Sequence, residues 1–294
     1  MSMTTTSPAA ATPADLGFAG TLHSEWIKLR SVRSTPWLLA LISVITVGVG
    51  TQMSSSMNFD WVEGGMPPQG VQAAGVMALT SSTDLNVLVV SVLGVLVIAG
   101  EYSSGSIRSS FAAVPRRVPV LLAKALVLAT VTFVVVALAT AVTIPISLTV
   151  LAGNGVDVRL DDPYYWRGAA FGVVYLALLA LIAVGIGAIF RTIVSGIAIV
   201  IGFVLVLPIA LGFVPGGLGP MIWLQNVTRL LPFNLGRAAY THPGYDDFIS
   251  LGARVERPAD GLWALDAWQG VLGLVSWVVV LFLVAIVALR RRDA

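Results

Sequence analysis

The chain of 294 residues contains no cysteine and only two histidines, His23 and His242. The absence of cysteine excludes disulfides, thiolate metal sites and cysteine nucleophiles. Neither histidine has a carboxylate or a second histidine at metal-ligand spacing. The sequence also lacks a His-Glu-x-x-His motif, a Gly-x-Ser-x-Gly nucleophile turn and a Gly-x-x-x-x-Gly-Lys-Ser/Thr phosphate loop. We therefore predict that the chain is not itself an enzyme and has no catalytic site, metal or cofactor of its own.

Charge is also scarce, because charged residues make up only 11% of the chain while hydrophobic residues make up 57%, with a mean hydropathy of +0.90. This balance is typical of a protein with several membrane spans. A helix needs about 20 mainly apolar residues to cross the hydrocarbon core, since lipid offers no partner for free backbone groups. The sequence thus predicts an all-α polytopic membrane protein with six transmembrane helices, at residues 36–53, 84–100, 118–151, 168–190, 193–213 and 267–289.

The third predicted span is unusually long, and the fourth and fifth are unusually close together. The third is longer than a bilayer requires, so we expect its helix to tilt or to project from the membrane, with a kink at Pro145. The fourth and fifth are separated only by the sequence FRTIVSG, in which Arg191 interrupts a long apolar run. Because a charged side chain is costly inside lipid, we expect a tight turn at the membrane surface there.

The positive charges favour one orientation. A cytosolic N-terminus places 11 of the 17 lysine and arginine residues on the inner side and 6 on the outer side. With six spans, both termini of this multi-pass protein of the cell (plasma) membrane would then be cytoplasmic. The same distribution accounts for the net charge of +2, so we do not expect nucleic-acid binding.

The segments outside the spans differ in character. Residues 1–20 lack the features of a signal peptide and are expected to form a disordered cytosolic tail. Residues 21–35 place Leu22, Trp26 and Leu29 on one face, which predicts a helix in the cytosolic interface, or alternatively only a positively charged flank of the first span. Residues 54–83 are rich in Gly, Ser and Pro and are expected to be a loop with little fold of its own.

The last outer loop, residues 214–266, contains PMIWLQNVTRLLPF between Pro220 and Pro232. Its apolar residues recur at helical spacing, which predicts a short amphipathic helix at the outer face before the sixth span. The glycosylation pattern at Asn226 lies inside this helix and is interpreted as a chance match.

The cytosolic loop GEYSSGSIRSSFAAVPRR, residues 100–117, separates the second and third spans. Ile107 and Phe111 would share one side of a short helix that ends at Pro115. From spacing alone, a loop that only fixes topology is an equal alternative.

Two stretches, SEWIKLRSVRSTPWLL and GEYSSGSIRSSFAAVPRRVPVLLAKAL, resemble export-type ABC transporter permeases (the ABC type-2 permease family), in particular actinobacterial members. The resemblance implies that residues 21–35 are an interfacial elbow helix and that the loop between spans two and three is a coupling helix that docks on an ATPase. It places Lys124 in the cytosolic extension of the third span. Carried over residue by residue, it assigns Glu101, Tyr102, Arg108, Arg116 and Arg117 to the ATPase-coupling loop and Glu25, Trp26, Lys28 and Arg30 to the elbow helix.

The function implied by the resemblance is that of a permease subunit that exports an amphipathic or hydrophobic substrate, such as a lipid, antibiotic or peptide. Two copies of a separate ABC ATPase subunit, which bind ATP and magnesium, would drive it, and a second permease, the same or homologous, would complete a dimer surrounded by membrane lipid. An ion-coupled secondary transporter is an alternative, although its usual mid-membrane charges are missing. A membrane-embedded lipid-modifying enzyme is a weaker one, since no catalytic polar groups are visible.

Overall fold

The computed structural model describes residues 17–59, 67–105, 117–212, 222–242 and 261–292. These residues form helices and contain no strand. Within them, six helical segments are long and apolar enough to cross a membrane: Ser34–Ser56, Pro68–Ser103, Val118–Gly153, Pro163–Phe190, Ile193–Leu211 and Ala267–Arg291. The prediction of an all-α polytopic membrane protein with six spans is confirmed.

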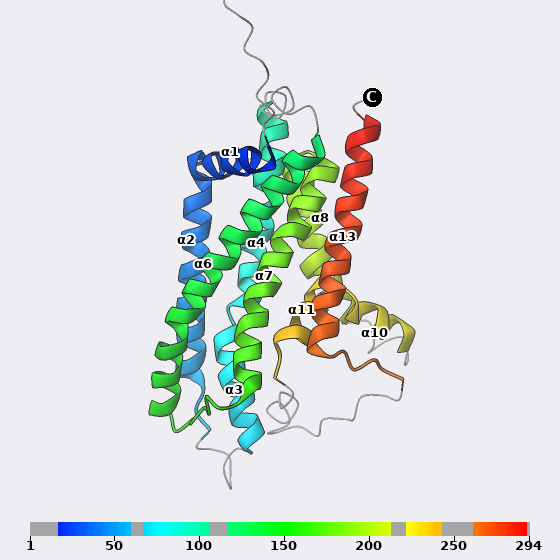
Figure 1. Ribbon diagram of the computed structural model, residues 1–294. Helices are drawn as coiled ribbons and strands as arrows, with labels where there is room; N and C mark the ends of the chain where they lie inside the picture. Colours follow the sequence, from blue (N-terminus) through cyan, green and yellow to red (C-terminus); the bar gives the residue numbers. More distant parts are fainter. Residues whose placement is uncertain (1–16, 60–66, 106–116, 213–221, 243–260, 293–294) are drawn as a thin grey trace, which may run out of the picture.

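The bundle is organised around α7 (Pro163–Phe190), which packs on α4 (Thr83–Ser104), α6 (Arg117–Gly153) and α13 (Ala267–Arg292) (Figure 1). Two-thirds (67%) of its most apolar window is buried inside the chain, against 17% for α13. The helix at the centre of the bundle therefore meets protein on most sides, whereas α13 leaves most of its surface uncovered within the chain.

Small residues bring α4 and α7 close together. A Cβ atom added to Gly94 would lie 2.5 Å from Ala183 Cβ, and one added to Gly187 would lie 2.6 Å from Ile98 Cγ2. In lipid, helix association depends on close packing because the hydrophobic effect gives no advantage over contact with lipid tails. These glycines thus permit close contact between α4 and α7.

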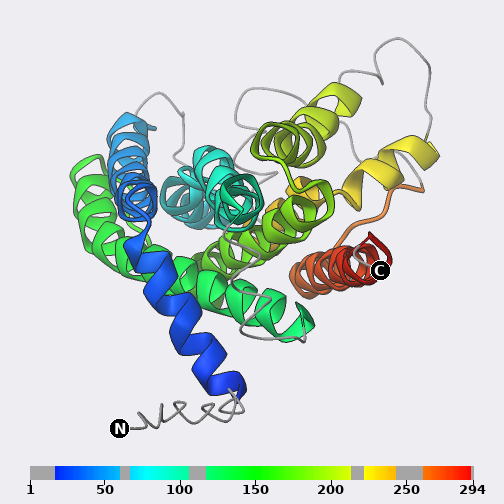
Figure 2. The same ribbon diagram turned by 90° about the horizontal axis from the view of Figure 1, so that it is seen from above.

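Two further helices pack against α6. Helix α1 (Phe18–Ser31) lies across one end of the bundle, and the chain then turns at Val32 and Arg33 into α2 (Ser34–Ser56), which runs beside α6 (Figures 1 and 2). We call this the α1 end; it also contains the last turns of α4 and α13 and the first turns of α6. Helix α1 starts three residues earlier than the predicted 21–35 segment, so the predicted tail 1–20 ends too late, and residues 1–16 of that tail lie outside the described residues.

The prediction that residues 54–83 form a loop was wrong. Helix α3 (Pro68–Thr80) begins at a proline in its first turn and continues after a break at Ser81 and Ser82 into α4. Its small residues are buried against α7, where a Cβ on Gly168 would lie 2.6 Å from Val76 Cγ1. The glycines, which had contributed to the loop prediction, instead allow close helix packing together with the alanines of α3.

The predicted tight turn between spans four and five is confirmed. Helix α7 ends at Arg191, whose φ of 60° is the one positive value for a non-glycine among the described residues, and α8 (Ile193–Ile201) follows at once. The fifth span then continues through a π-helical turn, η1 (Gly202–Val206), into α9 (Leu207–Gly212). Pro208 has no N–H to donate to the preceding turn, which accounts for the irregular backbone at this point.

The segment predicted as the last outer loop contains two short helices where one was predicted. Helix α10 (Ile222–Arg229) lies inside the predicted 220–232 segment, and α11 (Pro232–Tyr240), which was missed, packs against α7 and α13. Asn226 holds the loop: its Nδ2 donates to Gly261 O at 3.0 Å, and its Oδ1 accepts from Trp263 N at 2.9 Å. The interior position of Asn226 agrees with reading its glycosylation pattern as chance. Residues 243–260, expected to be irregular, lie outside the described residues.

Candidate functional site

Helix α1 presents one charged position to the bundle. Thr21, Glu25 and Leu29 recur every four residues and are buried against α6, because this spacing places them on one face. Trp26 faces away and is 41% exposed, with the Arg30 guanidinium 5.7 Å from the centre of its ring. The inward face of α1 is therefore the one that carries a carboxylate, and the outward face carries an aromatic side chain suited to a membrane surface.

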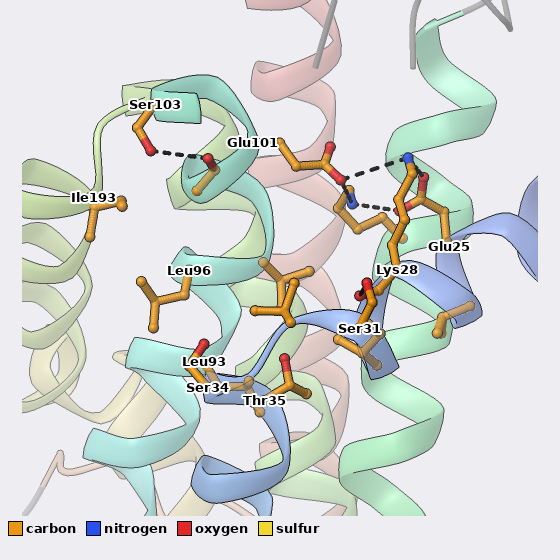
Figure 3. A pocket seen from close by; sticks show the side chains of 16 residues that line it. Glu25, Lys28, Ser31, Ser34, Thr35, Leu93, Leu96, Glu101, Ser103 and Ile193 are labelled. Atoms are coloured by element: carbon orange, nitrogen blue, oxygen red, sulfur yellow. Dashed lines mark hydrogen bonds and ion pairs between the residues drawn. The ribbon is translucent and has the colours of Figure 1, made fainter. Parts of the chain in front are cut away.

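Glu25 belongs to a cluster of two carboxylates and two ammonium groups at the α1 end (Figure 3). Lys124 Nζ, on α6, lies 2.5 Å from Glu25 Oε2 and 2.8 Å from Glu101 Oε1, near the end of α4. Lys28 Nζ lies 2.6 Å from Glu25 Oε1 and 3.7 Å from Glu101 Oε1. We call these four residues the charge cluster; it joins α1, α4 and α6.

Burial decides how strongly the charge cluster holds these helices. The side chains of Glu25 and Lys124 are each 3% exposed and that of Glu101 is 15% exposed, whereas that of Lys28 is 35% exposed. A buried charge is tolerated only when paired, because removal from water costs several kcal/mol per ion. The pairing of Lys124 with two carboxylates thus fixes α1 against the start of α6 and the end of α4.

A cavity of about 500 Å³ lies next to the charge cluster. Its walls come from α1, α2, α4, α6 and α8, and Figure 3 shows Leu93 and Leu96 below the charged groups with Ile193 facing them from α8. Ser31, Ser34 and Thr35 also line it. The α1 end therefore combines a charged rim with an apolar interior.

The structure brings together only part of the predicted coupling loop. Glu101 enters the charge cluster, and the ring of Tyr102 lies 5.1 Å from the guanidinium of Arg191 at the α7–α8 turn. Arg108 and Arg116 lie outside the described residues, as do Ile107 and Phe111 of the predicted short helix. Arg117 is the first residue of α6.

Lys124 was missed as a site residue. The sequence placed it in an extension of the third span, but its partner Glu25 is 99 residues away, beyond the reach of any local pattern. The available signal was charge balance: a lone lysine in an apolar run needs an acid at similar depth, and Glu25 and Glu101 were the two acids next to spans on the same side.

A second polar group lies at the opposite end of the bundle. Burial raises the pKa of the Tyr240 hydroxyl well above its usual range, so it stays protonated and donates to Asp84 Oδ1 at 3.3 Å. His242 Nε2 lies 3.2 Å from Asp162 Oδ2, which joins the end of α11 to the start of α7. The described residues contain no group of three or more His, Asp or Glu side chains that could hold a metal ion.

Comparison with known families identifies the scaffold that carries these features. The profile of the family described as ABC-2 family transporter protein matches residues 25–294, which is nearly the whole chain. The chain belongs to the ABC-2 transporter family. No curated protein matches it.

Membership in the ABC-2 family states what kind of component this chain is. It is a permease subunit of an ABC transporter and a multi-pass membrane protein, and such permeases are transport components that are not themselves catalytic. An ABC-2 permease normally works with an ATPase subunit and often with a partner permease. The match begins at Glu25, so it includes every member of the charge cluster.

Proposed function

We propose that this ABC-2 permease exports an amphipathic or apolar substrate across the cell membrane, driven by two copies of a separate ATPase subunit that bind ATP and magnesium. The α1 end faces the cytosol in this proposal, and a second permease, identical or homologous, completes the pathway. The observation that carries it is the charge cluster, which links α1 to the two helices that lead into and out of residues 106–116.

The charge cluster supplies a mechanical reason for coupling. If residues 106–116 dock on the ATPase, a displacement there acts on the ends of α4 and α6 together. Because Lys124 holds Glu101 of α4 and Glu25 of α1, the same displacement also moves α1. The three helices would respond as one unit, as a two-state gate requires.

The composition of the spans supports the substrate class. In the described membrane helices, charged residues lie within about two turns of a helix end, such as Asp84 and Glu101 on α4 and Lys124 on α6. A pathway built from these helices offers few charges to a bare ion and much apolar surface to a lipid-like molecule.

The test is reconstitution of the tagged permease with its ATPase in proteoliposomes, with transport of fluorescent amphiphiles followed after ATP addition. Transport is expected with the wild-type ATPase and not with an ATPase whose catalytic glutamate is replaced. Transport that continues with the inactive ATPase and stops when ionophores remove ion gradients would instead support the ion-coupled alternative.

A pair of charge reversals localises the coupling. Arg108→Glu with Arg116→Glu is expected to lower permease-stimulated ATP hydrolysis and ATPase recovery. The matched control, Arg290→Glu with Arg291→Glu, makes the same charge change at the end of α13 and is expected to leave both unchanged. Equal losses in the two double variants would contradict a specific role for the loop.

A further inference from the structure

The volume and the lining residues of the cavity at the α1 end suit one kind of ligand. Its volume of about 500 Å³ falls within the usual range of small-molecule sites, about 300–1,000 Å³. Its inner wall is aliphatic and comes from three helices, with Leu93, Leu96 and Val97 of α4, Val127 of α6 and Ile193 of α8. Such a wall favours a hydrocarbon chain over a polar solute.

The rim of the cavity is polar and carries both signs of charge. Lys28, the most exposed member of the charge cluster, and Glu101 both line the cavity, and they come from different helices. Among the described residues that line the cavity, two carboxylates and two ammonium groups balance, so this lining favours neither an anion nor a cation alone. It offers complementary partners to a head group that carries one charge of each sign.

Hydroxyl groups also line the cavity on the side of α1 and α2. They belong to Ser31, Ser34 and Thr35, and Figure 3 shows Ser34 and Thr35 below Lys28, at the level of Leu93. Their hydroxyls can donate hydrogen bonds to acceptor atoms of a ligand in the cavity.

We infer that this cavity binds a zwitterionic phospholipid of the ethanolamine type. The phosphate lies against Lys28, the ammonium group lies toward Glu101, and the start of one acyl chain lies along Leu93 and Leu96. The rest of the lipid extends into the bilayer, since the cavity is too small for two complete chains. This binding site goes beyond ATPase coupling, and it rests on the proposed function only for the position of the α1 end at a membrane surface.

Native mass spectrometry of the complete permease, purified without an ATPase, tests this assignment. The protein is exposed to mixed micelles that contain equal amounts of phosphatidylethanolamine and phosphatidylglycerol, and the retained lipid is identified. Preferential retention of phosphatidylethanolamine is expected. Equal or greater retention of phosphatidylglycerol would overturn the zwitterionic assignment.

Two variants locate the bound lipid. Leu96→Trp fills the cavity and is expected to lower phosphatidylethanolamine retention by about tenfold, while Lys28→Glu reverses the charge at the phosphate position and is expected to lower it similarly. The matched control is Leu126→Trp, which makes the same change on α6 at a side chain that is 50% exposed and outside the cavity. Equal effects of Leu96→Trp and Leu126→Trp would refute binding in this cavity.

The same spectra distinguish lipid from a second copy of the chain. If Leu96→Trp converts a dimer to a monomer while lipid retention is unchanged, the cavity is an interface between copies and the inference is wrong. Because no ATPase is present, a failure of lipid binding leaves the ATPase-driven function intact, and a failure of ATP-dependent transport leaves the lipid site intact.

Discussion

Removal of the Lys124 ammonium should destabilise the protein far more than removal of the Lys28 ammonium. Lys124→Met leaves Glu25 and Glu101 without their shared partner at a position where the Glu25 side chain is 3% exposed. Loss of one partner of a buried ion pair costs about 3–5 kcal/mol. Because Lys28 still contacts Glu25 at 2.6 Å, we expect the lower part of that range, about 3 kcal/mol.

The matched variant Lys28→Met removes the same charge from a side chain that is 35% exposed, so its expected cost is only about 0–1 kcal/mol. Reversible unfolding in mixed micelles measures both. The double variant Glu25→Gln/Lys124→Met should be more stable than the sum of its single losses predicts, by about 1–3 kcal/mol, since one of the two carboxylates that Lys124 contacted is then neutral. Equal losses for the two lysine variants, or strict additivity in the double variant, would refute the reasoning from burial.

Three further predictions concern packing and the outer loop. Gly236→Ala places a Cβ against the fully buried ring of Tyr175 and should cost about 1–3 kcal/mol of unfolding free energy, whereas Gly48→Ala, with no atom within 4 Å, should not destabilise. Ser147→Ala removes the 2.6 Å hydrogen bond to Ser54 between α2 and α6, but Ser54 still donates to Gly50 O. The unfolding free energy should therefore fall by only about 0.6 kcal/mol, and a fall of more than about 2 kcal/mol would contradict this account. Asn226→Ala should speed hydrogen exchange in 222–229 and 261–263, with Gln225→Ala as the control; unchanged exchange would mean that the two Asn226 bonds do not hold the loop.

The number and type of membrane helices could be predicted because lipid leaves the backbone few choices. A long apolar run must form a helix there, so the six spans followed from hydropathy, and the costly Arg191 correctly indicated a turn. These inferences depend on local composition alone.

The failures share a different cause, which is packing between distant segments. The glycines of α3 favour a loop when the sequence is read alone, but they allow close packing once α7 is present. Helix α11 has only nine residues, and its packing on α7 and α13 is not visible in its own sequence. In the same way, Glu25 and Glu101 were recognised one by one from resemblance, but their joint partner Lys124 becomes visible only after α1, α4 and α6 have met.

The distance along the chain between Glu25 and Lys124 also sets an order of events during biosynthesis. The two residues are 99 positions apart, so at translation rates of about 5–20 residues per second the carboxylate precedes its ammonium partner by about 5–20 s. During that interval Lys28, three residues away on the same helix, is the cation within reach of Glu25. Helix α1 can therefore pack on α6 only after the third span has been made. Until then, Lys28 can pair with Glu25.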